Sequence, residues 1–266
     1  MCIRDSGWSA ESAEVAARAV TVCTELGLAP VEAVAVDCAG RDGGPEAAAR
    51  DARYGALQAT AERLAAHAVL LGHTADDQAE TVLLGLARGS GTRSVAGMAA
   101  RRGLYRRPLL GVRRTTTLAA CEALGLRPWH DPANADPAYA RSRLRAVMPA
   151  LVEALGPGLV EALARTADLA REDATALDQW AQQVLDAAVD PDLPGYRTTV
   201  LAAAPDAVRR RALLFALRRA GCPAGALSRR HVLAVDGLVT DWRGQGPVDL
   251  PGGIRALRDC GRLALA

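Results

Sequence analysis

The amino-acid sequence predicts an α/β protein with a partial doubly wound parallel sheet, followed by a helical connector and a small α+β domain. In the first half, segments alternate in the order helix, strand, helix, strand, helix, which favours parallel strands joined by crossover helices. The next part is rich in alanine and leucine at helical spacing, and the end carries short apolar runs between turn residues. We expect an α/β core at residues 7–146, a connector at 147–190 and a C-terminal domain at 191–266.

The first elements follow from caps and apolar runs. Ser9 or Ser12 suits the N-cap of a helix that ends near residue 26, and residues 31–37 are expected to form a strand. A glycine-rich loop is expected at 38–44. Pro45 suits the first position of the next helix, which should end near residue 66.

The strongest local signal is the junction that follows. Residues 68–71 are apolar and predict a buried parallel strand, and Thr74 stands at the expected N-cap of a helix with Asp77 three residues later. Apolar residues at positions 79, 82, 83 and 86 give that helix one apolar face. The junction therefore lies at the carboxyl end of a strand, where open α/β sheets bind their ligands.

Three carboxylates occur in the first turns of this helix. Asp76 and Glu80 are four residues apart and share a helix face, and Asp77 lies close to that face. Such a group needs a cation or a proton nearby, which indicates a functional site. The alternative is structural, because acidic residues in a first turn stabilise the helix dipole and Asp77 suits a capping box. His73 and Asp76 are also spaced to ligate a metal, although a histidine at a strand end is more often a hydrogen-bonded structural group.

Beyond residue 146 the sequence predicts two helices and then a smaller domain. The helices cover about 148–185, with a break at Gly156-Pro157-Gly158. Residues 189–195 are rich in proline, aspartate and glycine, and we expect a linker there. The domain that follows has predicted helices at 207–220 and 228–239 and strands between 246 and 265, with a turn at 251–253.

The basic residues are unusual in type. The formal net charge is only +2 and the chain contains no lysine, so its Lys+Arg total consists of arginine alone. A coding bias explains this composition, yet arginine also recognises phosphate with two parallel hydrogen bonds. Arginine clusters are candidate RNA contacts, with solvated surface as the alternative. They lie at 101–102, 106–107, 113–114, 141–145, 209–211 and 229–230.

Cysteine usage and hydropathy exclude several classes. The six cysteines include no Cys-x-x-Cys pair, which argues against a zinc ribbon or a dithiol centre. The sequence shows no apolar run of about 20 residues and no signal-peptide pattern. We therefore expect a reduced, cytoplasmic protein with no membrane partner.

Several short motifs follow one another in a specific order. They are Gly72-His73-Thr74-x-Asp76-Asp77-Gln78-x-Glu80-Thr81, Arg88-Gly89-Ser90-Gly91, Arg107-Pro108-Leu109-Leu110, and the set Asp131, Pro132, Asn134, Asp136, Pro137, Tyr139, Arg141, Arg143 and Arg145. Together they resemble the signature of the tRNA(Ile)-lysidine synthetases, a family of PP-loop ATPases. The resemblance covers about residues 45–146.

The resemblance implies a Rossmann-like PP-loop fold and a two-step reaction. ATP adenylates the C2 carbonyl oxygen of the wobble cytidine of tRNA(Ile) with a CAU anticodon, and free L-lysine then displaces AMP to form lysidine. The implied partners are tRNA(Ile) and L-lysine, and the implied cofactors are ATP and Mg²⁺. A homodimer is one assembly that the resemblance allows.

The same resemblance implies roles for individual residues. Catalytic roles fall on Asp76, Asp77, Glu80 and Arg88, and Asp76 and Asp77 are also expected to bind Mg²⁺. His73 and Gly72 are expected to contact ATP. The arginines expected to contact tRNA are Arg88, Arg107, Arg141, Arg143 and Arg145. Arg88 lies about 16 Å from Asp77 along the helix axis, so the two are not expected to share one ligand.

The arginines at 141, 143 and 145 alternate in a way that one helix face cannot accommodate. At least one of them should therefore point away from a common ligand. The residues before them, Asn134, Asp136 and Tyr139, are typical of turns and suit a purely structural loop as well.

The nucleotide loop of the family, Ser-Gly-Gly-x-Asp-Ser, does not occur in this sequence. In the family an initial strand runs into this loop, whose backbone amides hold the ATP pyrophosphate. Asp5-Ser6-Gly7 is the nearest string, and no strand is predicted before it. We therefore expect that the segment carrying the loop is absent upstream, that residues 1–6 are foreign, and that the chain as written is inactive.

Three alternatives remain open at this point. Gly40, Gly43 and Gly44 follow a strand and precede a helix, which is the setting of a phosphate loop. A catalytically inactive tRNA-binding protein agrees with the missing motif. A PP-loop tRNA thiolase is a rival enzyme, but its chemistry usually uses paired cysteines, and Cys-x-x-Cys does not occur in the sequence.

Overall fold

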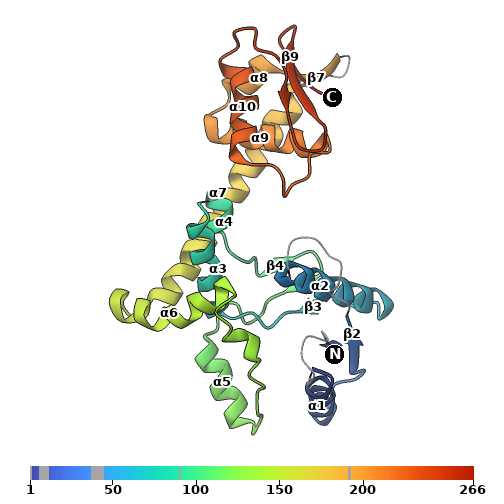
Figure 1. Cartoon of the computed structure of the whole chain (residues 1–266), viewed down its shortest axis with the longest axis vertical. Coiled ribbons are helices and arrows are strands. Elements are labelled where there is room, and N and C mark those ends of the chain that lie inside the picture. Colours follow the sequence, from blue (N-terminus) through green and yellow to red (C-terminus); the bar gives the residue numbers. More distant parts are fainter. Residues whose placement is uncertain (1, 6–11, 37–44, 90, 191–192) are drawn as a thin grey trace. The chain divides into compact units, whose positions relative to one another are not determined.

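A computed structural model describes residues 2–5, 12–36, 45–89, 91–190 and 193–266. The chain divides into two compact units (Figure 1). Unit 1 consists of Met1–Gly89 and Gly97–Ala167, and unit 2 of Ser90–Ala96 and Asp168–Ala266. The predicted glycine-rich loop at 38–44, with its alternative as a phosphate loop, lies outside the described residues, and so do Ser6 and Gly7. The predicted boundaries at 146 and 190 stay a prediction.

Unit 1 begins with two parallel strands and two helices. Strand β1 (Cys2–Asp5) pairs in parallel with β2 (Glu32–Ala35). The helices are α1 (Ser12–Glu25) and α2 (Pro45–Arg63), both close to their predicted bounds. The expectation that no strand precedes Asp5 is wrong. A four-residue strand has no periodicity of its own to reveal it, and its hydrogen bonds come from β2, which is distant in sequence.

A second sheet of unit 1 positions the motif region. Strand β3 (Val69–Leu70) pairs in parallel with β5 (Tyr105–Arg106), which pairs antiparallel with β4 (Arg101–Arg102). The predicted strand at 68–71 is therefore present, with two paired residues. The β4–β5 hairpin was not predicted, because strands of two residues leave no alternation in the sequence. Parallel pairing and crossover helices agree with the predicted doubly wound class, although the described strands of this unit are grouped in two small sheets.

Helices supply the rest of unit 1. Helix α3 (Ala75–Ala87) begins at the carboxyl end of β3 and packs against α6 (Ala140–Leu155). Between them come α5 (Arg114–Ala123) and a single 3₁₀ turn at Pro132–Asn134. Helix α6 starts eight residues before its predicted start at 148, because its arginine-rich first turns hide the apolar periodicity. The predicted break is confirmed, since α6 ends at Gly156 with a φ of 98° and α7 (Leu159–Ala188) follows.

Unit 2 packs helices on an antiparallel sheet. Its helices are α4 (Thr92–Val95), the later part of α7, α8 (Thr198–Ala203), α9 (Asp206–Arg219) and α10 (Arg229–Thr240). Its strands, in sheet order, are β6 (Val189–Asp190), β7 (Leu193–Arg197), β10 (Arg262–Leu265), β9 (Arg255–Asp259) and β8 (Val248–Asp249). Leu185, Leu213 and Leu263 are fully buried in its core. The helices predicted at 207–220 and 228–239 and the strands predicted between 246 and 265 are confirmed.

The linker predicted at 189–195 is wrong, because β6 and β7 form there. Gly195 has a φ of 84°, and a Cβ added to it would lie 2.6 Å from the carbonyl oxygen of Leu263. The glycine that suggested a flexible linker instead allows β7 to approach β10 closely.

The arginines of the cluster at 209–211 are all paired with carboxylates within unit 2, and their role as RNA contacts stays a prediction. Arg209 is buried and donates from Nε to Asp236 at 2.6 Å, and Arg210 donates to the same carboxylate at 2.8 Å. Arg211 donates to Asp178 at 2.9 Å. Asp206 on the same helix also pairs with Arg209 and Arg210, as the spacings of three and four residues allow, whereas the pairs with Asp236 and Asp178 join different helices and could not be deduced from sequence.

No single helix in the described part of the chain is both long and apolar enough to cross a membrane. Helices α6 and α7 meet those criteria only when they are taken together across their break.

Candidate functional site

The site begins with the cap of α3. The backbone N–H and the hydroxyl of Thr74 donate to Oδ2 of Asp77 at 2.8 and 2.9 Å, and the Asp77 N–H donates back to the Thr74 hydroxyl at 3.4 Å. This is the predicted capping box. The structural interpretation of Asp77 is therefore correct for one carboxylate oxygen. The other oxygen, Oδ1, accepts from Arg114 at 2.9 Å and from Arg145 at 3.4 Å.

Glu80 is the buried centre of the site. Its side chain is 2% exposed, and a buried carboxylate is stable as an anion only when it is paired. Arg145 donates to both of its oxygens, at 2.9 and 3.0 Å, and Arg114 donates at 3.2 Å. Arg141 lies 3.6 Å from the same carboxylate. The expectation that cations lie beside these acidic residues is thus confirmed.

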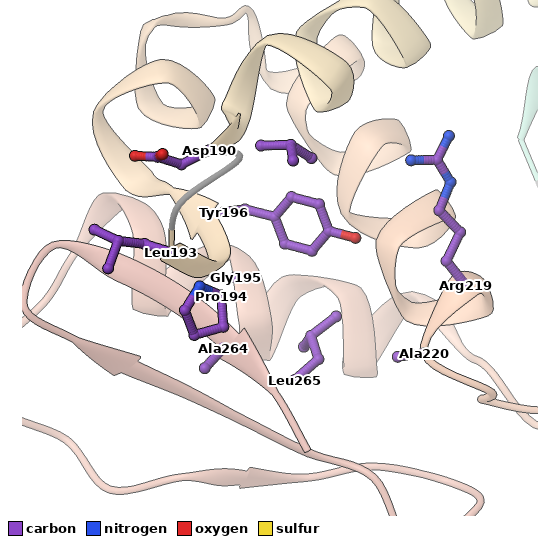
Figure 2. Close-up of a pocket in the computed structure, with 10 residues that line it drawn as sticks. Asp190, Leu193, Pro194, Gly195, Tyr196, Arg219, Ala220, Ala264 and Leu265 are labelled. Carbon is purple, nitrogen blue, oxygen red and sulfur yellow. The ribbon is translucent and has the colours of Figure 1, made fainter.

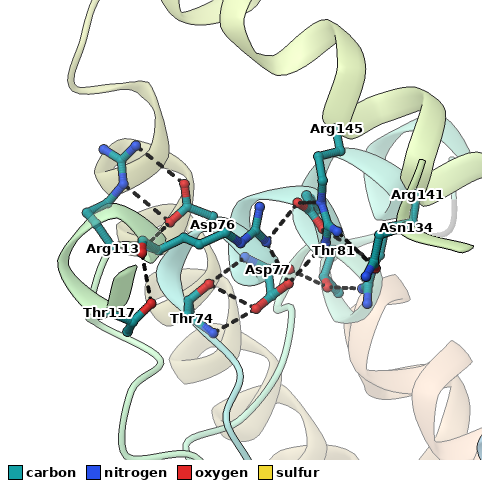
Figure 3. Close-up of polar contacts among 11 residues, drawn as sticks. Thr74, Asp76, Asp77, Thr81, Arg113, Thr117, Asn134, Arg141 and Arg145 are labelled. Carbon is teal, nitrogen blue, oxygen red and sulfur yellow. Dashed lines mark hydrogen bonds and ion pairs between the residues drawn. The ribbon is translucent and has the colours of Figure 1, made fainter. Parts of the chain in front are cut away.

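Asp76 connects α3 to α5. Its Oδ2 accepts the backbone N–H of Arg114 at 2.6 Å, so it caps the N-terminus of α5, where the N-cap residue Arg113 supplies no side-chain bond. The Arg113 guanidinium lies between Asp76, at 3.4 Å, and Glu161, at 2.8 Å. Figure 3 shows Arg113 beside Asp76, and Arg145 extending from α6 toward Asp77.

The ionisation states follow from these contacts. Burial by itself would raise the pKa of Asp77, but the two hydrogen bonds from Thr74 and the charges of Arg114 and Arg141 outweigh it and hold the pKa below its usual range. The hydrogen bond to Glu80 raises the pKa of Arg145, although burial opposes that shift. Burial, and then the charge of Arg107, lowers the pKa of His73, which favours a neutral imidazole at pH 7.

The residues at the end of β3 remain open to a ligand. The buried Nδ1 of His73 has no hydrogen-bond partner among the described residues. A Cβ added to Gly72 would meet no atom within 4 Å. An unpaired buried nitrogen beside open backbone fits an additional polar group at this point. The expected ATP contacts of His73 and Gly72 stay a prediction.

The three arginines of α6 divide as predicted. Arg141 donates to the hydroxyl of Thr81 at 2.8 Å, and Arg145 also reaches Asn134 at 3.1 Å. Arg143 points away and donates to the carbonyl oxygens of Pro137 and Ala138 at 2.6 and 2.9 Å. Two of the three therefore converge on the acidic residues of α3.

Two other expected site residues lie outside this cluster. Arg88 is the C-cap of α3, at the opposite end of the helix from Asp76 and Asp77. Arg107 is buried, and it donates to the carbonyl oxygen of Ala99 at 2.8 Å. Their roles in tRNA binding stay predictions.

Sequence reasoning missed the roles of Arg113, Arg114 and Gln78. The arginine pair was expected only as one of several surface clusters, and nothing local indicates that it meets α3. Gln78 is 1% exposed, donates to the carbonyl oxygen of Met98 at 2.9 Å and accepts the Met98 N–H at 2.7 Å. The place of Gln78 inside the matched motif was a signal of its importance, but nothing local indicates that its partner is Met98, which lies in a loop 20 positions later.

The acidic cluster does not form a ready magnesium site. Each oxygen of Asp76, Asp77 and Glu80 already faces an arginine, a backbone N–H or the Thr74 hydroxyl. Four arginines (113, 114, 141 and 145) balance four carboxylates (76, 77, 80 and 161). Among the described residues, no group of three or more His, Cys, Asp or Glu side chains could hold a metal ion. The structure thus gives no support to the histidine metal site.

The four arginines of this cluster are fixed in place and also reach solvent. The four arginine side chains are 29–33% exposed, so each is held by a carboxylate while part of the side chain faces solvent. Fixed guanidinium groups stabilise phosphate oxygens and developing negative charge.

Comparison with known proteins agrees with this geometry. A family model for the PP-loop domain matches residues 4–151, and the model of the TilS substrate binding domain matches residues 197–263. A tRNA(Ile)-lysidine synthase from Streptomyces coelicolor is 60% identical over 91% of this chain and 69% of its own length. One from Salinispora tropica is 57% identical over 97% of this chain and 79% of its own length.

A solved structure shares the fold. The U34-tRNA thiolase NcsA from Methanococcus maripaludis, with its [4Fe-4S] cluster, has a TM-score of 0.51 and 17% identity, covering 64% of this chain and 61% of that one. Identity this low shows the fold alone, so it does not favour the thiolase alternative. The predicted PP-loop fold is confirmed, and the relatives cover most of both units. The chain therefore belongs to the tRNA(Ile)-lysidine synthase family.

Proposed function

We propose that this protein is an ATP-dependent tRNA(Ile)-lysidine synthase. The C2 carbonyl oxygen of the wobble cytidine attacks the α-phosphorus of ATP and pyrophosphate leaves. The amine of free L-lysine then attacks C2 and AMP leaves. The observation that carries the proposal is the set of four arginines held by carboxylates at the carboxyl end of β3, in a chain of this family.

In this proposal the acidic residues position the arginines. Glu80 holds Arg145 through two hydrogen bonds, and Asp77 and Glu80 share Arg114. The exposed parts of these guanidinium groups face the charge that develops as pyrophosphate and AMP leave. A group fixed before the reaction stabilises that charge without reorganisation.

The remaining contacts are also proposals. His73 and Gly72 contact ATP, and Arg88, Arg107, Arg141, Arg143 and Arg145 contact a tRNA with a CAU anticodon. Mg²⁺ at Asp76 and Asp77 would first have to displace arginine donors, so it enters no step here. The proposed homodimer is tested by light scattering in solution.

The test is lysidine formation. Because the sequence contains no Ser-Gly-Gly-x-Asp-Ser motif, two proteins are compared: this chain, and a fusion in which a strand and that motif precede residue 12. Each is incubated with ATP, Mg²⁺, L-lysine and tRNA(Ile), and the nucleosides are analysed by mass spectrometry. We expect lysidine from the fusion and none from the chain as written.

Two variants of the fusion sharpen the test. Glu80→Gln should abolish turnover because it removes the carboxylate that Arg145 and Arg114 share, whereas Arg165→Gln, at an exposed arginine of α7 outside the cluster, should leave turnover within a few-fold of the parent. If the fusion hydrolyses ATP and binds tRNA without forming lysidine, the proposed reaction is wrong. That result would favour a tRNA-binding protein without catalytic activity.

A salt titration tests the tRNA contacts. Each phosphate contact contributes roughly −0.7 to −0.9 to the slope of log K against log salt concentration. Arg88→Gln should therefore make the slope shallower by about that amount, while Arg209→Gln, at a buried and internally paired residue, should leave it unchanged. An unchanged slope for Arg88→Gln would remove that residue from the tRNA interface.

A further inference from the structure

Unit 2 contains a pocket that the chemistry of α3 does not use. Its volume is about 650 Å³, within the range of cavities that bind small organic ligands. The walls come from β6, from residues 193–196 of β7, from the end of α9 and from the last residues of β10. Figure 2 shows Tyr196 in the middle of the lining, with its hydroxyl directed toward the side of Arg219 and Ala220.

One wall of the pocket is fixed by a single arginine. Arg262 donates to the carbonyl oxygens of Pro194 and Leu193 at 2.8 and 2.7 Å. It also lies 3.2 Å from the carboxylate of Asp190, whose charge it balances. The wall is therefore formed before any ligand arrives, and Asp190 adds little net negative charge to the pocket.

Two polar groups remain available to a ligand. Both terminal nitrogens of Arg219 lie 3.4 Å from Asp186, and the two side chains are 48% and 59% exposed. Such an exposed pair is weak in water, so the guanidinium can exchange its partner at low cost. The structure gives the Tyr196 hydroxyl no hydrogen-bond partner within its described part.

The residues that line the pocket indicate the chemical class of its ligand. Apart from Asp190, Tyr196 and Arg219, the lining is apolar or glycine. An aromatic ring among apolar walls suits a flat base, and an arginine at the margin suits a phosphate. A small carboxylate alone would leave most of the apolar wall in contact with water. Unpaired bases of RNA are bound in this way, by stacking on aromatic side chains with arginine on the backbone.

We infer that this pocket binds one unpaired nucleotide of the tRNA, with its base against Tyr196 and its phosphate at Arg219. The inference rests on the proposed function, which supplies RNA as the substrate. It also agrees with the match of residues 197–263 to a substrate binding domain. Residues 193–196 and 264–265, which line the pocket, come just before and just after the matched residues in the sequence.

The experiment measures binding of labelled hexauridylate to the full chain by fluorescence anisotropy, without ATP or lysine, and compares it with a short RNA duplex. Tyr196→Leu should weaken binding of the single strand about tenfold, since stacking on one aromatic side chain carries roughly that effect. Arg219→Gln should weaken it several-fold and make the salt dependence shallower. Arg218→Gln is the matched control, because Arg218 is the neighbouring exposed arginine and does not line the pocket; it should stay within about twofold.

A second measurement covers the case in which Tyr196→Leu fails to fold. Hexanucleotides containing 4-thiouridine are photo-crosslinked to the unmodified chain, and the site is located by mass spectrometry. Crosslinks to residues 193–196 or 219–220 support the inference. Crosslinks found only elsewhere overturn it, as do unchanged affinities in the Tyr196→Leu and Arg219→Gln variants. These experiments do not measure lysidine, so a negative result for the pocket does not refute the proposed reaction. In the same way, a failure to form lysidine does not refute nucleotide binding by this pocket.

Discussion

The most demanding prediction concerns the buried pair of Glu80 and Arg145. Replacement by Arg145→Gln removes both hydrogen bonds that Arg145 makes to Glu80, at 2.9 and 3.0 Å, and leaves a carboxylate that is 2% exposed with fewer donors. Removing one partner of a buried ion pair costs about 3–5 kcal/mol. Arg114 and Arg141 remain beside Glu80, and the Arg145 side chain is 29% exposed. We therefore expect a smaller loss, about 2–3 kcal/mol, from the local stability of α3 and α6.

The assay is hydrogen exchange followed by mass spectrometry on peptides from α3 and α6. It resolves unit 1 from unit 2, which a global unfolding curve does not. Peptides from α9 serve as an internal reference that should not change. Arg143→Gln is the matched control on the same helix, because Arg143 donates to the loop carbonyl oxygens of Pro137 and Ala138 and not to the carboxylates of α3. It should cost less than about 1 kcal/mol.

A double-mutant cycle completes the test. Glu80→Gln combined with Arg145→Gln should show a coupling energy of about 1.5 kcal/mol or more, as expected for charged side chains in direct contact. If Arg145→Gln costs no more than Arg143→Gln, or if the coupling is near zero, the buried pair does not hold α3 and α6 together. The positioning role given to Glu80 would then be refuted.

Three further predictions follow from particular contacts. The pKa of Asp77 in the folded state lies below its unfolded value of about 3.9, so its contribution to the free energy of unfolding is complete above that value and is lost as pH falls through the folded pKa. Asp77→Asn should therefore flatten the dependence of unit 1 stability on pH between about 5 and 2, and an unchanged slope would contradict this. Asp76→Ala removes the cap of α5 and should lower the local stability at the start of that helix by about 1–2 kcal/mol, seen as faster hydrogen exchange. Helix α10 has its own capping box at Ser228 and should keep its exchange rates; equal effects on both helices would show general destabilisation. Gly97→Ala should lower the free energy of unfolding more than Gly103→Ala does, because both residues have a φ near +55° but only at Gly97 would the added Cβ meet Gln78, at 2.7 Å from Oε1. Measured by urea unfolding, we expect a loss of about 1 kcal/mol for Gly103→Ala and about 1–3 kcal/mol more for Gly97→Ala.

The sequence by itself determined the features that depend on neighbouring residues. The start of α3 was predictable because Thr74 and Asp77 cap the helix within four positions, and the break between α6 and α7 because Gly156 and Pro157 end a helix locally. The ordered motifs identified the family, since each is a short string. It was also predictable that at least one of Arg141, Arg143 and Arg145 points away from the others, because residues at this spacing cannot share one helix face.

Only the tertiary structure decided how the charged residues pair. Arg145 is 65 positions from Glu80 and Arg114 is 37 from Asp77, so their contacts depend on how α5 and α6 pack on α3, which no local pattern contains. The same holds for the pairs that join the arginines at 209–211 to Asp236 and Asp178 on other helices, and for β6 and β7, whose glycine and proline indicated a linker. Local propensity fixes the backbone within a few residues, whereas burial and pairing across dozens of residues are fixed by packing alone.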